Sequence, residues 1–275
     1  MSEIHPTAVI DPKARIGADC TIGAYSVIGP HVVLGAGNRI ASHVVIDGHT
    51  AIGAGNTFFQ FASIGAAPQD LKFKGEPSQL IIGDNNVVRE YVTLQPGTAH
   101  GGMKTTIGDG NLFMACSHVG HDAVIGDHNI FANSSALAGH VTVGSRVTIG
   151  GMCGVHQFVR LGDQCLLGAG SMVAKDIPPF CIAQGDRAVL FDINRIGLRR
   201  AGVAAKDITR MHALFKEVFM KPGKFHERVQ ELYEKEAGFQ IGREFLGFML
   251  HRSKRGIAFA AHAAQGGALE EYVEP

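Results

Sequence analysis

The chain has 275 residues, of which 45% are hydrophobic and 18% are charged, and its 25 basic and 25 acidic residues leave a formal net charge of zero. This apolar content suffices for one large and one smaller domain, and the balanced charge gives no general attraction to nucleic acid or to an anionic membrane. The five cysteines form no C-x-x-C pair, the start lacks a signal-peptide core, and no run of 18 apolar residues occurs, so we expect a cytoplasmic protein without a disulfide framework or a transmembrane segment.

A six-residue period fills the first two thirds of the chain. An apolar residue that precedes a small residue recurs in steps of six from Ile10 to Ile64 and from Ile107 to Val173. This period fits neither an amphipathic helix nor an alternating strand. It fits a triangular coil of eighteen residues in which each side is one short strand and a turn, and in which each coil rises by about 4.8 Å. The repeat therefore predicts a parallel β-helix, whose core grows one coil at a time.

Two insertions interrupt the repeat, at about residues 65–79 and 95–106. The interval from Ile64 to Ile82 is eighteen residues, so we expect the register to survive the first insertion. We expect both segments to form loops.

Helical periodicity replaces the hexads near the C-terminus. Pro178 and Pro179 disfavour further strand pairing. Apolar residues at i, i+3, i+4 and i+7 spacing predict helices around residues 208–218, 225–232 and 245–250.

These boundaries predict two domains. The β-helix should span residues 1–185 and the helical domain residues 186–275. We expect the Ala- and Gly-rich tail from Ala258 to be loosely ordered.

The eighteen-residue coil converts sequence distance into proximity. His121, Gly139 and Gln157 are eighteen residues apart and should form one column, with Asp122 and His140 in the next. Seven residues should gather within about two coil rises, on the order of 10 Å: His118, His121, Asp122, Gly139, His140, His156 and Gln157.

Three interpretations of this cluster stay open. A histidine beside a carboxylate can act as a general base, and a glycine one coil away can offer its backbone N–H to an oxyanion. Alternatively His118, His121 and His140 could bind zinc, as in the γ-class carbonic anhydrases, which share this type of helix. The third is a purely structural solenoid whose histidines carry no activity.

Several motifs resemble the UDP-N-acetylglucosamine O-acyltransferase family, which begins lipid A synthesis. The resemblance covers the β-helix and most of the helical domain, and it implies that the β-helix is left-handed. The matching segments are QFASIG, QDLK at Gln69–Lys72, GEP at Gly75–Pro77, NLFMACSHVGHD, LAGHVTV, GGMCGVHQF, IAQG and N-x-x-GLRR at Asn194–Arg200.

The resemblance implies roles for individual residues. His121 would be the general base that deprotonates the sugar 3-hydroxyl, Asp122 would adjoin it, and the N–H of Gly139 would stabilise the tetrahedral oxyanion. The other implied positions line the substrates. The acceptor and pantetheine contacts would be Gln69, Asp70, Lys72, His118, His140, His156, Gln157, Asn194, Arg199 and Arg200, and the acyl-length ruler would be Ala169, Met172 and Arg187.

The resemblance also implies the partners. The donor would be a 3-hydroxyacyl group on the phosphopantetheine arm of acyl carrier protein, the acceptor a UDP-sugar, and the enzyme a homotrimer with clefts between subunits and with no cofactor or metal. Basic residues of the helical domain could meet the acidic carrier protein. The candidates are Arg199, Arg200, Lys206, Arg210, Lys216 and Lys221.

Three residues depart from the usual family pattern. Gln95 stands where many members have histidine, Ile196 where many have glutamate, and Ala201 where many have a third basic residue. The first two leave open whether the acceptor carries a 3-hydroxyl or a 3-amino group. Acyl-chain length is open as well, and pocket volume favours a medium to long chain.

Overall fold

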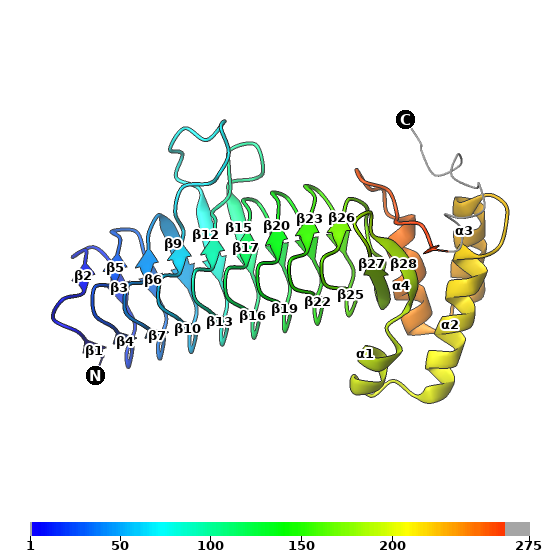
Figure 1. Cartoon of the computed structure of the whole chain (residues 1–275), viewed down its shortest axis with the longest axis horizontal. Helices are drawn as coiled ribbons and strands as arrows, with labels where there is room; N and C mark the ends of the chain where they lie inside the picture. Colours follow the sequence, from blue (N-terminus) through cyan, green and yellow to red (C-terminus); the bar gives the residue numbers. More distant parts are fainter. Residues whose placement is uncertain (1, 262–275) are drawn as a thin grey trace.

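The computed structural model describes residues 2–261, which form a stack of triangular coils followed by helices (Figure 1). Each coil contributes one short strand to each of three sheets, here called sheets A, B and C. In these sheets every strand pair is parallel except the last pair of sheet A. The structure therefore has the solenoid architecture that the six-residue period predicts.

The strands are short, and most contain two residues. Sheet A contains, in spatial order, β1 (Glu3–Ile4), β4 (Thr21–Ile22), β7 (Arg39–Ile40), β10 (Thr57–Phe58), β13 (Val87–Val88), β16 (Leu112–Phe113), β19 (Ile130–Phe131), β22 (Thr148–Ile149), β25 (Leu166–Leu167), β27 (Cys181–Gln184) and β28 (Val189–Ile193). Sheet B contains β2 (Val9–Ile10), β5 (Val27–Ile28), β8 (Val45–Ile46), β11 (Ser63–Ile64), β14 (Thr93–Leu94), β17 (His118–Val119), β20 (Ala136–Leu137), β23 (Gly154–Val155) and β26 (Met172–Val173). Sheet C contains β3 (Arg15–Ile16), β6 (Val33–Leu34), β9 (His49–Ile52), β12 (Gln79–Ile82), β15 (Lys104–Ile107), β18 (Val124–Ile125), β21 (Thr142–Val143) and β24 (Arg160–Leu161).

The pairing register is eighteen residues wherever the repeat is uninterrupted, as in the pair His118 and Ala136. Across the first insertion the pairing register is not eighteen residues. An eighteen-residue count places Ile82 beside Ile64, whereas the structure places Ile82 beside Ile52. The six-residue register thus survives, but the insertion lengthens one corner and does not add a coil.

Both inserted loops leave the β-helix at the corner between sheets B and C. Loop 1 comprises residues 65–78 and loop 2 residues 95–103, because β12 begins at Gln79 and β15 at Lys104. The two loops are therefore slightly shorter than the sequence indicates. In Figure 1 they project together from one side of the stack.

The core consists of the inward-facing residue of each strand, stacked on its equivalent one coil away. In sheet A this column includes Ile22, Phe58, Phe113 and Phe131, all almost completely buried. The rings of Phe113 and Phe131 stack with centroids 4.5 Å apart. Burying one such side chain stabilises the fold by about 1.5–3 kcal/mol, so the repeated column is the main source of stability.

An asparagine ladder lines the corner between sheets C and A. The side-chain oxygen of each asparagine accepts the backbone N–H of the residue one coil on, at 2.8 Å from Asn111 to Asn86. At Asn129 the ladder ends, because the next coil has Val147, which still donates its N–H to Asn129 at 2.7 Å. Its members are all fully or almost fully buried: Asn38, Asn56, Asn86, Asn111 and Asn129.

Four helices follow the last coil: α1 (Arg195–Arg200), α2 (Ala205–Phe219), α3 (Phe225–Lys235) and α4 (Gln240–Leu250). The structure confirms the three helices that periodicity predicts, now as α2, α3 and α4. It adds α1 and the antiparallel strand β28, which were too short to give a periodic signal. The predicted domain boundary at residue 185 falls in the turn between β27 and β28.

The expectation of loose order from Ala258 is wrong for the first residues of that segment. Ala258 and Ala260 are buried, and the N–H of Leu190 donates to the Phe259 carbonyl at 2.7 Å. These residues add a bridge beside β28. The rest of the predicted tail, residues 262–275, lies outside the described residues.

Among residues 2–261, no helix combines the length and the hydrophobicity needed to cross a membrane.

Candidate active site

The candidate site lies at the corner between sheets B and C, on the coils that follow the two loops. His121 and Asp122 form the turn between β17 and β18. Gly120 permits this turn because a Cβ at that position would press against the backbone of Ala138 and Gly139 in the next coil. The repeat thus stacks successive corner residues, and the sequence places a histidine and an aspartate at one of them.

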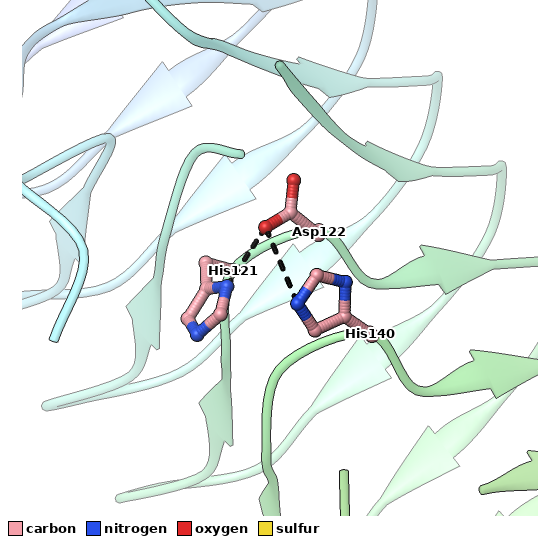
Figure 2. Close-up of side chains that lie close together, drawn as sticks. All are labelled: His121, Asp122 and His140. Atoms are coloured by element: carbon pink, nitrogen blue, oxygen red, sulfur yellow. Dashed lines mark hydrogen bonds and ion pairs between the residues drawn. The ribbon is translucent and has the colours of Figure 1, made fainter. Parts of the chain in front are cut away.

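His121 and Asp122 form a hydrogen-bonded pair, shown in Figure 2. The Nδ1 atom of His121 lies 2.8 Å from Oδ2 of Asp122, and both residues are buried. A carboxylate accepts the Nδ1 proton, so the imidazole keeps the lone pair on Nε2. That tautomer suits a general base.

Asp122 is held from several sides. Its Oδ1 accepts the N–H of Thr98 at 2.9 Å, and its Oδ2 accepts the Thr98 hydroxyl at 2.6 Å. Its own N–H donates to Oγ1 of Thr105 at 2.7 Å. A Cβ on Gly101 would collide with the carboxylate, so loop 2 covers it closely. The carboxylate is therefore fixed in position.

Gly139 lies against the ring of His121. A Cβ on Gly139 would clash with the imidazole, so only glycine fits at this position in the observed geometry. Within residues 2–261, the Gly139 N–H donates no hydrogen bond to another protein group. An N–H without a protein acceptor, beside a poised base, is suited to stabilise a developing oxyanion.

His140 occupies the column next to His121, as the coil length predicts. Its Nε2 lies 3.9 Å from Oδ2 of Asp122, and its ring is almost perpendicular to that of His121 (Figure 2). Burial lowers the pKa of His140 from its ordinary value, although Asp122 partly opposes the shift. His140 is therefore neutral near pH 7.

A stack continues outward from His140. Its ring lies parallel to that of Phe158, with centroids 4.5 Å apart, and Nζ of Lys254 is 4.3 Å from the Phe158 ring centre. Phe158 and Lys254 were not predicted from the sequence. The signal for Phe158 was available, since it stands eighteen residues after His140; Lys254 comes from the helical domain and has no place in the repeat.

His118 lies on the same coil as His121, at the start of β17. Its Nδ1 is 2.6 Å from Oγ1 of Thr93, one coil earlier. Burial lowers the pKa of His118, and the nearby His121 lowers it further. A second neutral histidine therefore neighbours the pair.

An open, largely apolar cavity of about 1030 Å³ adjoins these histidines. His118 and His156 are in its wall, together with Leu137, Val155 and Val173 of sheet B. Its volume and its lining suit an apolar chain. His118, on the same coil as His121, thus borders a space for an aliphatic group.

A metal could in principle contact three of these residues. His121, Asp122 and His140 offer ligand atoms that all lie within 4.8 Å of one another. This set differs from the sequence hypothesis, because Asp122 replaces His118. The short bond between His121 and Asp122 would have to open for both to bind an ion.

Family models and single relatives both match the chain. A model described as domain 2 of Udp N-acetylglucosamine O-acyltransferase matches residues 176–258, and models of bacterial hexapeptide repeats match residues 1–36 and 13–48. An acyl-[acyl-carrier-protein]–UDP-N-acetylglucosamine O-acyltransferase of Aliarcobacter butzleri is 46% identical over 94% of this chain and 99% of its own length. One from Myxococcus xanthus is 49% identical over 94% and 99%.

The chain belongs to the UDP-N-acetylglucosamine O-acyltransferase family.

Solved structures agree with this membership. The UDP-N-acetylglucosamine acyltransferase of Francisella novicida matches with a TM-score of 0.92 at 32% identity, over 99% of each chain. That of Campylobacter jejuni matches with a TM-score of 0.89 at 35% identity, over 94% of this chain and 99% of its own. The fold is the left-handed parallel β-helix with C-terminal helices that the resemblance implied.

Loop 1 carries the acceptor residues that the acyltransferase motif implies. The N–H of Lys72 donates to Oδ1 of Asp70 at 2.9 Å, which fixes a turn in the loop. Asp70 is close enough to His140 to raise its pKa slightly against the larger effect of burial. Gln69 and Lys72 are exposed. The loop therefore reaches the histidine cluster with free polar side chains.

Gln157 lies at the corner one coil after Gly139, as the coil length predicts, but its side chain is exposed and its carbonyl faces Nδ1 of His156 at 3.2 Å. Gln95, one of the three departures from the family pattern, is buried. The structure thus places Gln157 at the open edge of the corner.

The residues of the N-x-x-GLRR motif are not brought to this corner within one chain. Asn194 caps α1, accepting the N–H of Gly197 at 2.9 Å and donating to the Gln164 carbonyl at 2.9 Å. Arg199 and Arg200 are exposed on α1, which lies beyond the last coil, far from the loops (Figure 1).

Two of the three expected acyl-length residues line the cavity. Met172 and Arg187 are in its wall. Ala169 lies at the corner after β25 and is not among the lining residues. The structure therefore associates Met172 and Arg187 with the cavity, and not Ala169.

Proposed function

We propose that the protein transfers a 3-hydroxyacyl group from acyl carrier protein to the 3-hydroxyl of UDP-N-acetylglucosamine, the first step of lipid A synthesis, with His121 as general base. Nε2 of His121 takes the hydroxyl proton as the oxygen attacks the thioester carbonyl. The N–H of Gly139 stabilises the tetrahedral oxyanion. The C–S bond then breaks, and the imidazolium returns its proton to the pantetheine sulfur.

The observation that carries this proposal is the arrangement of three groups. The base is oriented by Asp122 at 2.8 Å, Gly139 lies against its ring, and the Gly139 N–H has no protein acceptor in the described chain. A proton acceptor and an oxyanion donor side by side are the two requirements of acyl transfer.

The acceptor is proposed to be the 3-hydroxyl sugar because the relatives are named O-acyltransferases. Purified protein should be assayed with both acceptor sugars and a series of acyl carrier protein thioesters. We expect turnover with UDP-N-acetylglucosamine and a preference for one chain length. Turnover with the 3-amino sugar alone would contradict the hydroxyl assignment.

We further propose that the enzyme is a cytoplasmic homotrimer with clefts between subunits, in which Asn194, Arg199 and Arg200 of one subunit approach the corner of another. The five cysteines are all unpaired, in keeping with a reducing compartment. An exposed aromatic ladder supports association, because such apolar surfaces are typical of protein contacts. Its rings, 5.1–5.3 Å apart, belong to Tyr25, His43, Phe61 and Tyr91.

Sedimentation equilibrium tests this assembly. We expect a mass three times that of the 29.2 kDa chain. A species with the mass of one chain at micromolar concentration would contradict it.

We propose that the exposed basic residues of the helical domain meet acyl carrier protein. Arg199, Arg200 and Lys206 are exposed and make no recorded ion pair within the described chain, so their charges are available. Arg210 and Lys221 form ion pairs with Glu236 and Glu217, so their charges are less available to a partner.

A zinc enzyme is the second candidate, favoured by the ligand atoms of His121, Asp122 and His140. Metal analysis of protein purified without chelators decides between the two. Acyl transfer without bound metal supports the proposed function, whereas stoichiometric zinc that is needed for activity favours the alternative.

A further inference from the structure

Glu76 connects the two loops. Its Oε2 accepts the N–H of Lys74 within loop 1 at 2.8 Å, and its Oε1 accepts the N–H of Ala99 in loop 2 at 3.0 Å. The hydrogen bond from Ala99, followed by that from Lys74, lowers the pKa of Glu76. The carboxylate is therefore charged at neutral pH and accepts one hydrogen bond from each loop.

Thr98, the neighbour of Ala99, connects loop 2 to the catalytic pair. It is buried, and it gives two hydrogen bonds to Asp122, one from its N–H and one from its hydroxyl. Its own carbonyl accepts the N–H groups of Gly101 and Met103, at 3.1 and 2.9 Å. Thr98 is thereby held in a tight turn directly above the carboxylate.

The Oδ2 atom of Asp122 has two donors, the Thr98 hydroxyl at 2.6 Å and Nδ1 of His121 at 2.8 Å. A continuous series of hydrogen bonds and one peptide unit thus runs from Glu76 through Ala99, Thr98 and Asp122 to His121. Loop 1, at the start of this series, also carries the acceptor residues Asp70 and Lys72.

We propose that Glu76 and Thr98 are positioning residues that couple loop 1 to the general base, so that ordering of loop 1 by the acceptor sugar fixes the orientation of His121. The proposal rests on the proposed function, since it concerns the base of that reaction. Glu76 is therefore expected to affect turnover and not only acceptor binding. The hydrogen bonds that start at Glu76 lead through loop 2 to the carboxylate of Asp122, which orients the base.

Substitution of Thr98 tests the second half of the series. Thr98→Val removes the hydroxyl and keeps the shape, and Oδ2 of Asp122 then binds His121 alone. We expect kcat to fall roughly 10- to 100-fold, the usual effect of losing a hydrogen bond to a charged group. The KM for the sugar should change little, because Thr98 acts on the base and not on the acceptor. Separate measurement of kcat and of this KM distinguishes the loss from weaker acceptor binding.

Thr98→Ser should restore kcat, and Thr148→Val is the matched control. Thr148 lies on β22 in sheet A, and its hydroxyl forms no hydrogen bond with the part of the chain that the structure describes. Wild-type kcat in Thr98→Val, or a loss that Thr98→Ser does not restore, would overturn the positioning role of Thr98.

Substitution of Glu76 tests the first half. Glu76→Ala should lower kcat, and Glu76→Gln, which keeps one acceptor oxygen for Ala99, should lower it less. In the double variant Glu76→Ala with Thr98→Val, the loss should be smaller than the product of the single losses, because both act through Asp122. Glu231→Ala, on an exposed face of α3, is the control for the alanine substitution.

A rise in the KM for the sugar with unchanged kcat in Glu76→Ala would overturn the coupling, as would fully multiplicative losses in the double variant. Failure of the proposed function is distinguishable, because it would appear as absent acyl transfer by the wild-type protein.

Discussion

Asp122 is the residue on which most hydrogen bonds of the site converge. It adopts a left-handed backbone conformation with φ 59°, which aspartate tolerates better than most residues. In this conformation its carboxylate turns back toward the neighbouring His121, and Thr98 and Gly101 enclose it. The Asp122 side chain therefore both holds loop 2 in place and fixes the tautomer of His121.

Substitution of Asp122 by asparagine should remove tautomer control and leave the fold intact. The amide can donate a hydrogen bond to Nδ1, which would move the imidazole proton to Nε2 and abolish its basicity. We expect kcat to fall by about two to four orders of magnitude, a range typical for the loss of general-base function. Steady-state acyl transfer measures this effect, and circular dichroism confirms folding. A decrease of less than threefold would contradict the role of Asp122.

The sequence predicted the partners of His121 within the repeat but not those outside it. Gly139 and His140 followed from adding eighteen to His121 and Asp122, because the coil length fixes their proximity. Thr98 could not be predicted in this way, since it lies in loop 2, whose path no period determines. Lys254 could not be predicted either, because its position depends on how the helical domain packs on the last coils.

At the scale of elements, the three corners of the β-helix have different compositions. The corner between sheets C and A carries the buried asparagine ladder, whereas the corner between sheets B and C carries the loops and the catalytic pair. The hexad pattern predicted the strands and the core. It did not predict that Ile82 pairs with Ile52, because the eighteen-residue interval from Ile64 to Ile82 equals one full coil and so conceals the insertion.

The asparagine ladder gives a stability prediction. Asn86→Leu removes the acceptor for the N–H and the side-chain amide of Asn111, which bond to Asn86 at 2.8 and 3.0 Å. Each buried donor left without a partner costs about 1–3 kcal/mol, so for the two donors we expect a loss of about 2–6 kcal/mol in the free energy of unfolding. Urea denaturation measures it. The control Asn133→Ala, at an exposed corner, should change stability by less than about 0.5 kcal/mol; an equal loss in both variants would contradict the ladder's role.

At the scale of the whole molecule, polar and aromatic contacts attach the helical domain to the last coils. The guanidinium of Arg160 bonds the buried carboxylate of Asp176 at 2.6 Å and lies 4.5 Å from the ring centre of Phe248 in α4. On the same helix, Glu244 forms a hydrogen bond with Asp163 of the β-helix. Burial, and then the charge of Asp163, raises the pKa of Glu244 to about 7.

This carboxyl pair predicts a pH dependence of stability. Between pH 4.5 and about 7, Glu244 is protonated in the folded protein and ionised in the unfolded chain. The free energy of unfolding therefore falls as the pH rises through this range. Glu244→Gln keeps a neutral partner for Asp163 and should reduce this decline, raising the thermal midpoint at pH 8 more than at pH 5. The control Glu231→Gln should follow the wild-type profile. Parallel profiles for wild type and Glu244→Gln would contradict the assignment.

The central claim, that His121 is the base of an acyl transfer, is tested most directly by the turnover of His121→Ala. The measurement is the initial rate of transfer from 3-hydroxyacyl carrier protein to UDP-N-acetylglucosamine, with the oligomeric state and thermal midpoint checked on the same sample. We predict a loss of at least about two orders of magnitude in kcat while assembly and stability persist. Turnover within a few fold of wild type would contradict the account.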